Sequence, residues 1–288
     1  MSASPPLKRS SLDAQPFLQR QCETLFEAIL VDDEVDEDLR QPDTIHLLHG
    51  QASLVSCFRL ARQLWIEGFD RDLLVRLSRT MMRERDLDAA DRLSLKHMRA
   101  KFKHLRYAHA LYGARHRQPP MLDLISVVIG QAQDAYRVGD GAAVARWARL
   151  LRVLLARPIE RWVRSESDRL VPTSSGDFRD LLVEDFRRLE ALLAGPTTDG
   201  HTFHKVRRIV GRQVSFWDTL RTIAPTDDRF RMSRWLSAIN GEMGDIHDRL
   251  VERRARDASS YGAQFFLPEP IRRRITVLVA VARDSPVD

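Results

Sequence analysis

The 288-residue sequence has only two cysteines, Cys22 and Cys57, and each lies within an apolar helical pattern. A disulfide framework is therefore unsupported, and two small buried thiols in a reducing cytoplasm are the simpler interpretation. No apolar run reaches the roughly 18 residues that a transmembrane helix needs. The N-terminal residues MSASPPLKRSS also lack the apolar core of a signal peptide. We therefore expect a cytoplasmic protein without a membrane span.

Several motifs of known chemistry are missing. The sequence has no Walker motif, no glycine-rich dinucleotide turn and no nucleophile elbow. It also has no zinc-finger, RNA-recognition or helix-turn-helix signature. Two patterns leave a metal site as an alternative: His46 and His49 at i, i+3, and the pair His247–Asp248 with Asp245 near it. No further ligand falls at a persuasive spacing, so we expect no metal, no cofactor and no catalytic residue.

Positive charge is unevenly distributed along the chain. The net charge is +6, but residues 1–42 carry nine acidic and four basic side chains, which leaves a net charge of +11 on the remainder. A surplus of this sign and size favours nucleic acid, polyphosphate, an acidic protein or a membrane surface as the partner. The acidic run from Asp32 to Asp38 is either a solvated linker or an internal mimic of an anionic ligand that covers the basic face.

Apolar residues recur at helical spacing along almost the whole chain, without strand–helix alternation. We predict helices over residues 16–31, 43–65, 70–85, 86–118, 121–137, 142–170 with a bend or break at Pro158, 177–194, 202–224, 228–256, and from about 270 onward. Residues 275–281 are β-branched enough to form a strand instead. Helices joined by short loops predict an all-α bundle.

The sequence shows internal similarity at an offset of 158 residues. His46 then lies over His204, and Asp70-Arg71 lies over Asp228-Arg229. This correspondence predicts a duplication with the following organisation: a disordered tail over 1–15, an N-terminal helix and acidic linker over 16–42, a first helical repeat over 43–137, connecting helices over 142–170 and a second helical repeat over 177–284. Two related helix sets packed face to face would leave a basic cleft or channel between them.

The strongest charge signal lies in the fourth predicted helix. From residue 92 to residue 122 there are eight Lys or Arg and four His, and no acidic residue. At about 100° per residue, one narrow face holds Lys96, Arg99, Lys103 and Arg106, and the opposite side holds Met98, Phe102, Leu105 and Tyr112. Like charges at this spacing repel one another, so we expect an anion to neutralise them.

The eighth predicted helix has a similar arrangement. One side holds His204, Arg207, Arg208 and Arg212, and the other holds Phe203, Val206, Val210 and Trp217. His204 falls in the first turn, where free backbone N–H groups favour anions. The alternative is a histidine that caps its own helix.

These residues resemble the CHAD family, named for a conserved histidine in an α-helical domain. The similarity lies in FHKVRRIVGRQV at 203–214, IHDRL at 246–250, IHLLHGQASLV at 45–55, Arg-Asp at 85–86 and the basic helix KHMRAKFKHLRY at 96–107. His49 stands where the family prefers arginine. Gly211 and Val214 stand where further basic residues would be expected.

The resemblance implies binding of inorganic polyphosphate, or a similar polyanion, in a Lys/Arg/His-lined channel between two helical repeats, without turnover. It carries over His46, His204, Arg207 and Arg212, whereas Lys96, Arg99, Lys103 and Arg106 follow from helix geometry. His49 and Arg208 complete the expected polyanion-binding set. The alternatives are a helical scaffold that binds an acidic protein or nucleic acid, and a metal-dependent phosphohydrolase.

Overall fold

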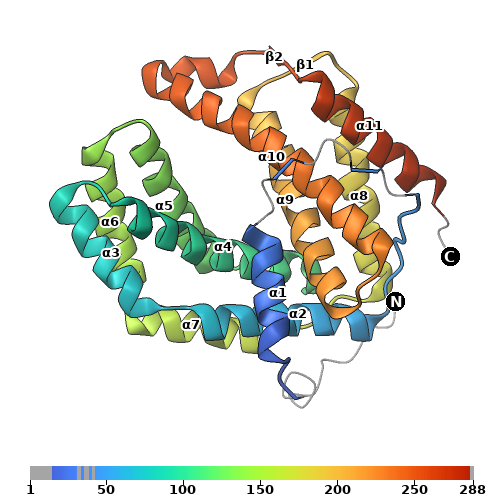
Figure 1. Ribbon diagram of the computed structural model, residues 1–288, viewed down its shortest axis with the longest axis horizontal. Coiled ribbons are helices and arrows are strands. Elements are labelled where there is room, and N and C mark those ends of the chain that lie inside the picture. The colour runs from blue at the N-terminus through green and yellow to red at the C-terminus, as the bar shows by residue number, and fades with distance from the viewer. Residues whose placement is uncertain (1–14, 31–33, 36–38, 41–42, 286–288) are drawn as a thin grey trace. The chain divides into compact units, whose positions relative to one another are not determined.

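The computed structural model describes residues 15–30, 34–35, 39–40 and 43–285. Helices dominate this part of the chain, and two strands of two residues each form the only sheet within it (Figure 1). The prediction of an all-α protein is confirmed at this level. Residues 1–14 of the predicted tail and most of the acidic linker lie outside the described residues.

The helices have bounds that can be compared with the predicted ranges. They are α1 Gln19–Leu30, α2 Gln51–Gly68, α3 Arg71–Glu84, α4 Ala89–Tyr112, α5 Pro120–Arg137, α6 Gly141–Leu154, α7 Arg157–Asp168, α8 Ser175–Leu193, α9 Gly200–Ile223, α10 Asp227–Arg256 and α11 Glu269–Asp284, with a short 3-10 helix, η2, at Ala258–Gly262. Side-chain oxygens of Asp70, Asp88 and Asp140 accept backbone N–H groups at the starts of α3, α4 and α6. These local caps explain why several predicted starts are close to the observed ones.

The chain divides into two compact units. One consists of residues 1–18 and 58–172, and the other consists of residues 19–57 and 173–288. The division falls within α2, so the predicted first repeat, residues 43–137, is shared between the units. The predicted second repeat, residues 177–284, lies entirely in the second unit.

The first unit is held together by α4, which packs on α5, and by α6, which packs on both α5 and α3. Trp65 and Phe102 are among its largest fully buried side chains, and their rings meet edge to face with centroids 5.8 Å apart. The four side chains predicted to point inward from the fourth helix, Met98, Phe102, Leu105 and Tyr112, are all buried. The helical phase predicted for α4 is therefore confirmed.

The second unit is organised around α9 and α10, which lie side by side (Figure 1). Helix α1 packs on α9, and α8 packs on α9 and α11. Strand β1, Thr197–Thr198, pairs antiparallel with β2, Phe265–Phe266, and so connects the segment before α9 with the segment before α11. The predicted inward side of α9, Phe203, Val206, Val210 and Trp217, is buried.

Residues 43–50, predicted as the start of the second helix, are not helical, and α2 begins only at Gln51. Ile45 and Leu47 are buried, whereas His46 and Leu48 are exposed, which is the alternation of an extended chain. The backbone N–H of Ile45 donates a 2.9 Å hydrogen bond to Oγ of Ser285. The predicted helix start is wrong because a contact with the far end of the chain satisfies this backbone in an extended form.

Two other expectations are decided by the structure. The range 142–170 is split rather than bent, because α6 ends at Leu154 and α7 begins at Arg157 with Pro158 in its first turn. Residues 275–281 belong to α11 and are not a strand. Ile275, Leu278 and Ala282 are buried at helical spacing, so packing of one helix face outweighs the β-branched composition.

The predicted duplication is matched only in part by the helix bounds. At an offset of 158 residues, α9 and α10 correspond to residues 42–65 and 69–98, whereas α2 and α3 span residues 51–68 and 71–84. His204 lies on α9, but its counterpart His46 lies in the extended segment. The two histidines do not share a local structure, and the duplication stays a prediction.

Candidate functional site

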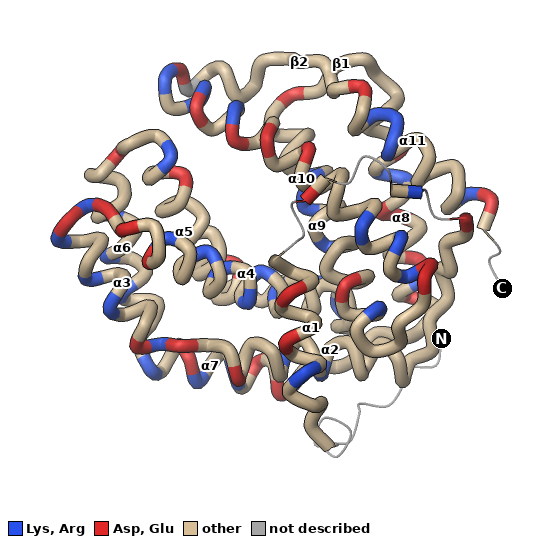
Figure 2. Tube along the Cα trace, viewed as in Figure 1, with Lys and Arg blue, Asp and Glu red and all other residues tan. Residues whose placement is uncertain are grey.

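Helix α4 in the first unit carries three of its four predicted cations at least partly open to solvent. Lys96 is exposed, and Arg99 and Lys103 are half-buried. Figure 2 shows Lys and Arg positions along this helix. A Cβ placed on Gly130 of α5 would lie 2.8 Å from Nη2 of Arg99, so the guanidinium of Arg99 occupies the space above that glycine. Lys96, Arg99 and Lys103 are therefore presented along the side of α4 that runs beside α5.

Arg106, the fourth cation of the predicted stripe, is part of the helix packing. Its exposed fraction is 8%, and its Nη1 donates a 2.7 Å hydrogen bond to Oδ1 of Asp123 at the start of α5. The acid-free stretch of sequence ends at residue 122, and the first acidic residue beyond it folds back onto this arginine. The sequence predicts a bound anion that neutralises Arg106, but Asp123 of the same unit compensates its charge.

Helix α9 in the second unit carries four of the predicted polyanion-binding residues. His204 and Arg208 are exposed and Arg207 is half-buried. The helix begins at Gly200, and the carboxylate of Asp199 accepts the backbone N–H groups of His201 and Thr202. The first turn is thus capped by an acid. The expectation that free N–H groups beside His204 attract an anion is corrected by this cap, and the site depends on side chains instead.

The side chains of α9 meet those of α10 at His204 and Arg207. The rings of His204 and His247 have centroids 5.6 Å apart and planes inclined by 33°. A Cβ on Gly244 of α10 would lie 3.5 Å from Nη2 of Arg207, so the guanidinium lies close to the backbone of α10. The Nε of Arg207 is buried and has no hydrogen-bond partner among the described residues. His247, which the sequence also offered as part of a metal site, is thus a neighbour of His204.

Arg212, one turn further along α9, has an internal partner. Its guanidinium forms an ion pair with the carboxylate of Asp185 on α8, which is fully buried, and Nε2 of Gln213 donates a 2.6 Å hydrogen bond to the same carboxylate. Burial raises the pKa of Asp185, and the charge of Arg212 opposes that rise. The charge of Arg212 is therefore used to hold α8 against α9, and we remove this residue from the candidate site.

His49 and His46, predicted as binding residues of the first repeat, have different surroundings. His49 is 7% exposed and lies against Phe178, Phe216 and Trp217 of the second unit, with its ring centroid 4.9 Å from that of Phe216. Burial lowers the pKa of His49 to about 4, so the ring is neutral at pH 7 and offers no charge to an anion. His46 is exposed in the extended segment. We therefore remove His49 from the candidate site.

Two acidic residues, one in the acidic linker and one directly after it, pair with arginines of α10. Oε2 of Glu34 lies 3.8 Å from Nη2 of Arg234, and Oδ2 of Asp43 lies 3.1 Å from Nη1 of Arg231. Both arginines are on α10, away from the α9 motif in sequence. Apart from Glu34, the acidic residues between 32 and 38 lie outside the described residues. Masking of a basic face by this segment therefore stays a prediction.

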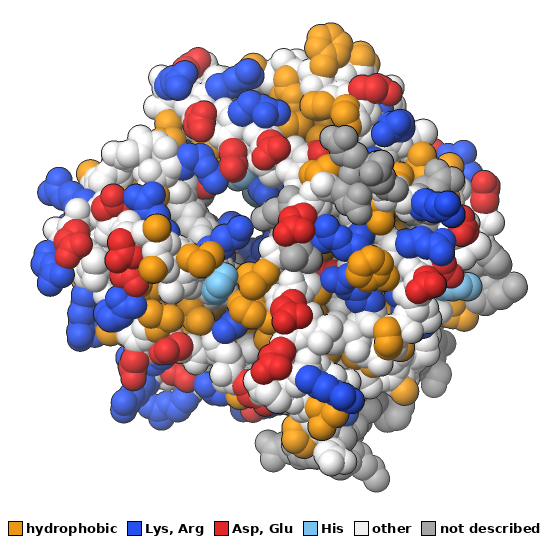
Figure 3. All heavy atoms as spheres, viewed as in Figure 1, with side chains coloured by type: hydrophobic (Ala, Val, Ile, Leu, Met, Phe, Trp, Pro, Cys, Tyr) orange, Lys and Arg blue, Asp and Glu red, His pale blue; other side chains and the backbone are white. Residues whose placement is uncertain are grey.

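Charge is mixed elsewhere on the second unit. Figure 3 shows basic and acidic side chains mixed over the end of α10. The sequence of this end includes Arg249, Glu252 and Arg253. By contrast, residues 200–217 of α9 include no acidic residue. The cationic character is therefore concentrated on α9 rather than spread evenly over the unit.

The described residues include no group of three His, Cys, Asp or Glu side chains placed so that they could hold a metal ion. The two histidine patterns considered for metal binding thus gain no third ligand there. Among the described helices, none combines the length and apolar character needed to cross a bilayer.

The described residues thus form an all-α protein. One helix of each unit, α4 in the first and α9 in the second, carries Lys, Arg or His side chains on one side. The chain matches no protein-family model, no curated protein and no solved structure.

Proposed function

We propose that the protein binds inorganic polyphosphate, or a similar polyanion, without turning it over, and that the primary contact is the face of α9 formed by His204, Arg207 and Arg208. The observation that carries this proposal is the guanidinium of Arg207. Its Nε is buried and has no hydrogen-bond partner among the described residues, and His204, one turn earlier on α9, lies against the ring of His247. A phosphate oxygen would accept this N–H in a charge-assisted hydrogen bond. The resemblance of residues 203–214 to the CHAD motif supports the same ligand.

The α4 face, Lys96, Arg99 and Lys103, is proposed as the second contact. It lies in the other unit, and the channel that the resemblance implies between two repeats stays a prediction. Both faces lack acidic residues in the surrounding sequence, which suits a ligand with a charge on every repeating unit. Arginine on α9 matches phosphate oxygens with its planar fork, whereas lysine on α4 acts as a point charge.

Binding can be measured by fluorescence anisotropy with end-labelled long-chain polyphosphate at about 100 mM salt. We expect Arg207→Gln combined with Arg208→Gln to weaken affinity by about 10-fold or more, because two charge-assisted contacts are lost. The slope of log affinity against log salt should decrease by about 2. The matched control is Arg187→Gln with Arg188→Gln on α8, which removes the same charge from exposed side chains of the same unit.

Equal affinity of these two double variants would reject the α9 site in favour of a general charge effect. Lys96→Gln combined with Lys103→Gln tests the α4 face by itself, with an expected loss of about 3-fold to 10-fold. If that variant binds like the wild type, α4 is not part of the site and the shared channel is ruled out.

Two further measurements separate the proposal from its alternatives. Competition between polyphosphate and single-stranded RNA for the same protein ranks the two ligands, and a clear preference for RNA would reassign the site to nucleic acid. Phosphate release from polyphosphate should stay at background level with Mg²⁺ or Mn²⁺ present. Release that disappears with His247→Ala would instead support a phosphohydrolase.

A further inference from the structure

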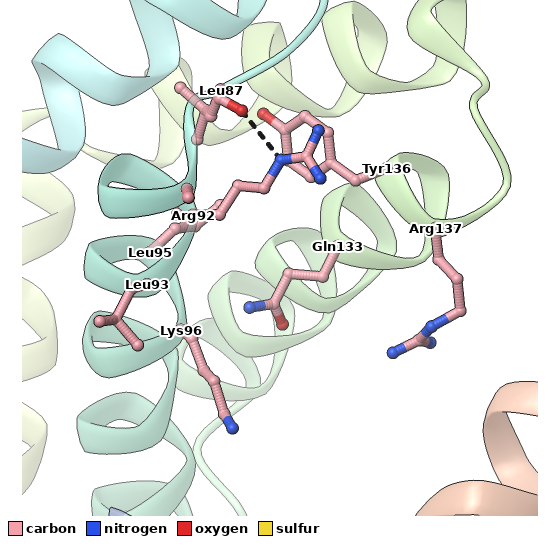
Figure 4. A pocket seen from close by; sticks show the side chains of 9 residues that line it. Leu87, Arg92, Leu93, Leu95, Lys96, Gln133, Tyr136 and Arg137 are labelled. Atoms are coloured by element: carbon pink, nitrogen blue, oxygen red, sulfur yellow. Dashed lines mark hydrogen bonds between the residues drawn. The ribbon is translucent and has the colours of Figure 1, made fainter.

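A cavity of about 670 Å³ opens between the first half of α4 and the last turns of α5, within the first unit (Figure 4). Its volume is within the range of about 300–1,000 Å³ that is typical of small-molecule sites. The lining residues come from α4 and the loop before it and from α5, and none of those that the structure describes there is acidic. The cavity combines cationic, polar and apolar side chains, so it suits a ligand that has both a charged group and an apolar group.

One end of the cavity is polar. In Figure 4 the side chains of Lys96 from α4 and of Gln133 and Arg137 from α5 extend toward the same open end. Arg137 has a long contact of 3.4 Å with Asp134, and its side chain is about one third exposed. An ammonium, a guanidinium and an amide from two helices can together donate several hydrogen bonds to one anionic group.

The other end of the cavity is apolar and aromatic. Leu87 lines it together with the ring of Tyr136 (Figure 4). Arg92 lies over the Tyr136 ring at 5.1 Å, and its Nε donates to the carbonyl oxygen of Leu87. Arg92 also pairs with Asp86, so it supports the ring and contributes little net charge.

The hydroxyl of Tyr136 is an unsatisfied polar group at this end. It is buried and has no hydrogen-bond partner among the described residues. Burial also raises the pKa of Tyr136, which keeps the hydroxyl protonated and able to donate. Because a buried hydroxyl without a partner costs free energy, an acceptor atom on a bound molecule would be stabilised there.

We propose that this cavity binds a small amphiphilic anion, an aryl or short acyl group that carries a phosphate or a carboxylate. The anionic group would lie at Lys96, Gln133 and Arg137, and the apolar group would lie against Leu87 and the Tyr136 ring. This site is distinct from the proposed polyphosphate site, because a polyphosphate chain has no apolar surface to bury against the apolar end of the cavity. The apolar part is therefore the distinguishing feature of the ligand.

Calorimetric titration of the full-length protein with phenyl phosphate tests the proposal. We expect phenyl phosphate to bind about 10-fold or more tightly than inorganic phosphate or phenol, because only the whole probe reaches both ends of the cavity. Benzoate distinguishes a carboxylate ligand from a phosphate ligand, and tight binding of either acid supports the proposal. Equal affinities for phenyl phosphate and inorganic phosphate would overturn it.

Two substitutions locate the binding within the cavity. Arg137→Gln should weaken phenyl phosphate by about 5-fold to 20-fold, whereas Arg161→Gln on the exposed side of α7 should change it by less than 2-fold. Tyr136→Phe should weaken binding of a probe with an acceptor near the ring, such as 4-nitrophenyl phosphate, by about 3-fold. It should also raise the melting temperature by about 2–4 °C, because an unsatisfied hydroxyl is removed. A fall in melting temperature with unchanged binding would show that the hydroxyl has no such role.

Failure of this proposal can be told apart from failure of polyphosphate binding. Arg137→Gln should leave polyphosphate affinity within about 2-fold of the wild type. The Arg207→Gln and Arg208→Gln variant should leave the phenyl phosphate titration unchanged. If Arg137→Gln abolishes both phenyl phosphate and polyphosphate binding while the protein remains folded, the cavity is not an independent site.

Discussion

Arg106 on α4 and Asp123 on α5 form an ion pair of 2.7 Å, although the arginine belongs by helical spacing to a stripe of four cations. The guanidinium is also 5.0 Å from the ring centroid of its neighbour Tyr107. The stripe therefore serves two purposes. Lys96, Arg99 and Lys103 are at least partly accessible to a ligand, whereas Arg106 joins two helices of the first unit.

Asp123→Asn should destabilise the first unit without changing polyanion affinity. The substitution leaves the mostly buried guanidinium of Arg106 without its charged partner, and we expect a loss of about 1–3 kcal/mol in the free energy of unfolding. Urea titration measures this loss. Glu84→Gln breaks the exposed pair with Arg83 and should cost less than about 1 kcal/mol. A clear gain in polyphosphate affinity by Asp123→Asn would return Arg106 to the binding surface, because the substitution releases its charge.

Asp185→Asn should have the largest effect among the ion pairs of the second unit. Asp185 is fully buried and is the shared partner of Arg212 and Gln213. Removal of one member of a buried pair usually costs about 3–5 kcal/mol, because the remaining charge is left without compensation. Denaturant unfolding should show a clear fall in midpoint. The adjacent exposed carboxylate offers the control, and Glu184→Gln should leave the midpoint nearly unchanged. Equal midpoints for the two variants would contradict the structural role of Asp185.

The buried histidines predict that stability falls under mildly acidic conditions. Burial lowers the pKa to about 4 for His49, about 3 for His104 and about 4 for His109. Below the unfolded value of about 6.5, the unfolded chain binds protons that the folded chain does not bind. The stability is therefore intact above about pH 6.5 and declines as the pH falls from there toward 4, by on the order of 2 kcal/mol for each histidine at pH 5.

Melting temperatures at pH 7 and pH 5 check this dependence. His49→Phe should reduce the difference between the two temperatures, because a phenyl ring suits the aromatic surroundings of residue 49 and does not titrate. The exposed neighbour provides the control, since His46→Gln should leave the difference as it is in the wild type. An unchanged difference in the His49 variant would show that this ring does not contribute.

Gly200→Ala should destabilise the start of α9. A Cβ on Gly200 would lie 2.5 Å from the backbone carbonyl oxygen of Tyr261 in η2, and a backbone atom cannot easily move away. We expect a loss of about 1–3 kcal/mol, as is typical of overpacked sites. Gly176→Ala is the matched control in the first turn of α8, where the nearest atom is Oγ of Ser174 at 3.9 Å. That substitution should be neutral or slightly stabilising.

Several helix ends could be predicted because their signals lie in the sequence next to them. Asp70 caps α3, and Pro158 falls in the first turn of α7, so both positions follow from the preferences of single residues. The segment 43–50 could not be predicted in the same way. Ile45 and Leu47 suit a helix or an extended chain over so short a run, and the bond to Ser285 decides between them.

The candidate site was predicted less completely than the fold, for a related reason. Helical spacing predicts that Lys96, Arg99 and Lys103 share one side of α4 and that His204, Arg207 and Arg208 share one side of α9, and all six are exposed or half-buried. It gave no information on which cations meet an acid from another helix. Arg106 and Arg212 have such partners, and the partners are 17 and 27 residues away along the chain.

The amino-acid sequence alone was enough to establish the helical class and the phase of the cation-bearing helices, because periodicity and end caps act over a few neighbouring residues. Tertiary packing decided that Arg106 and Arg212 pair with acids of other helices and that His49 is neutral, because burial and ion pairing depend on residues brought together from distant positions. The same packing created the cavity between α4 and α5, which no local pattern could have indicated.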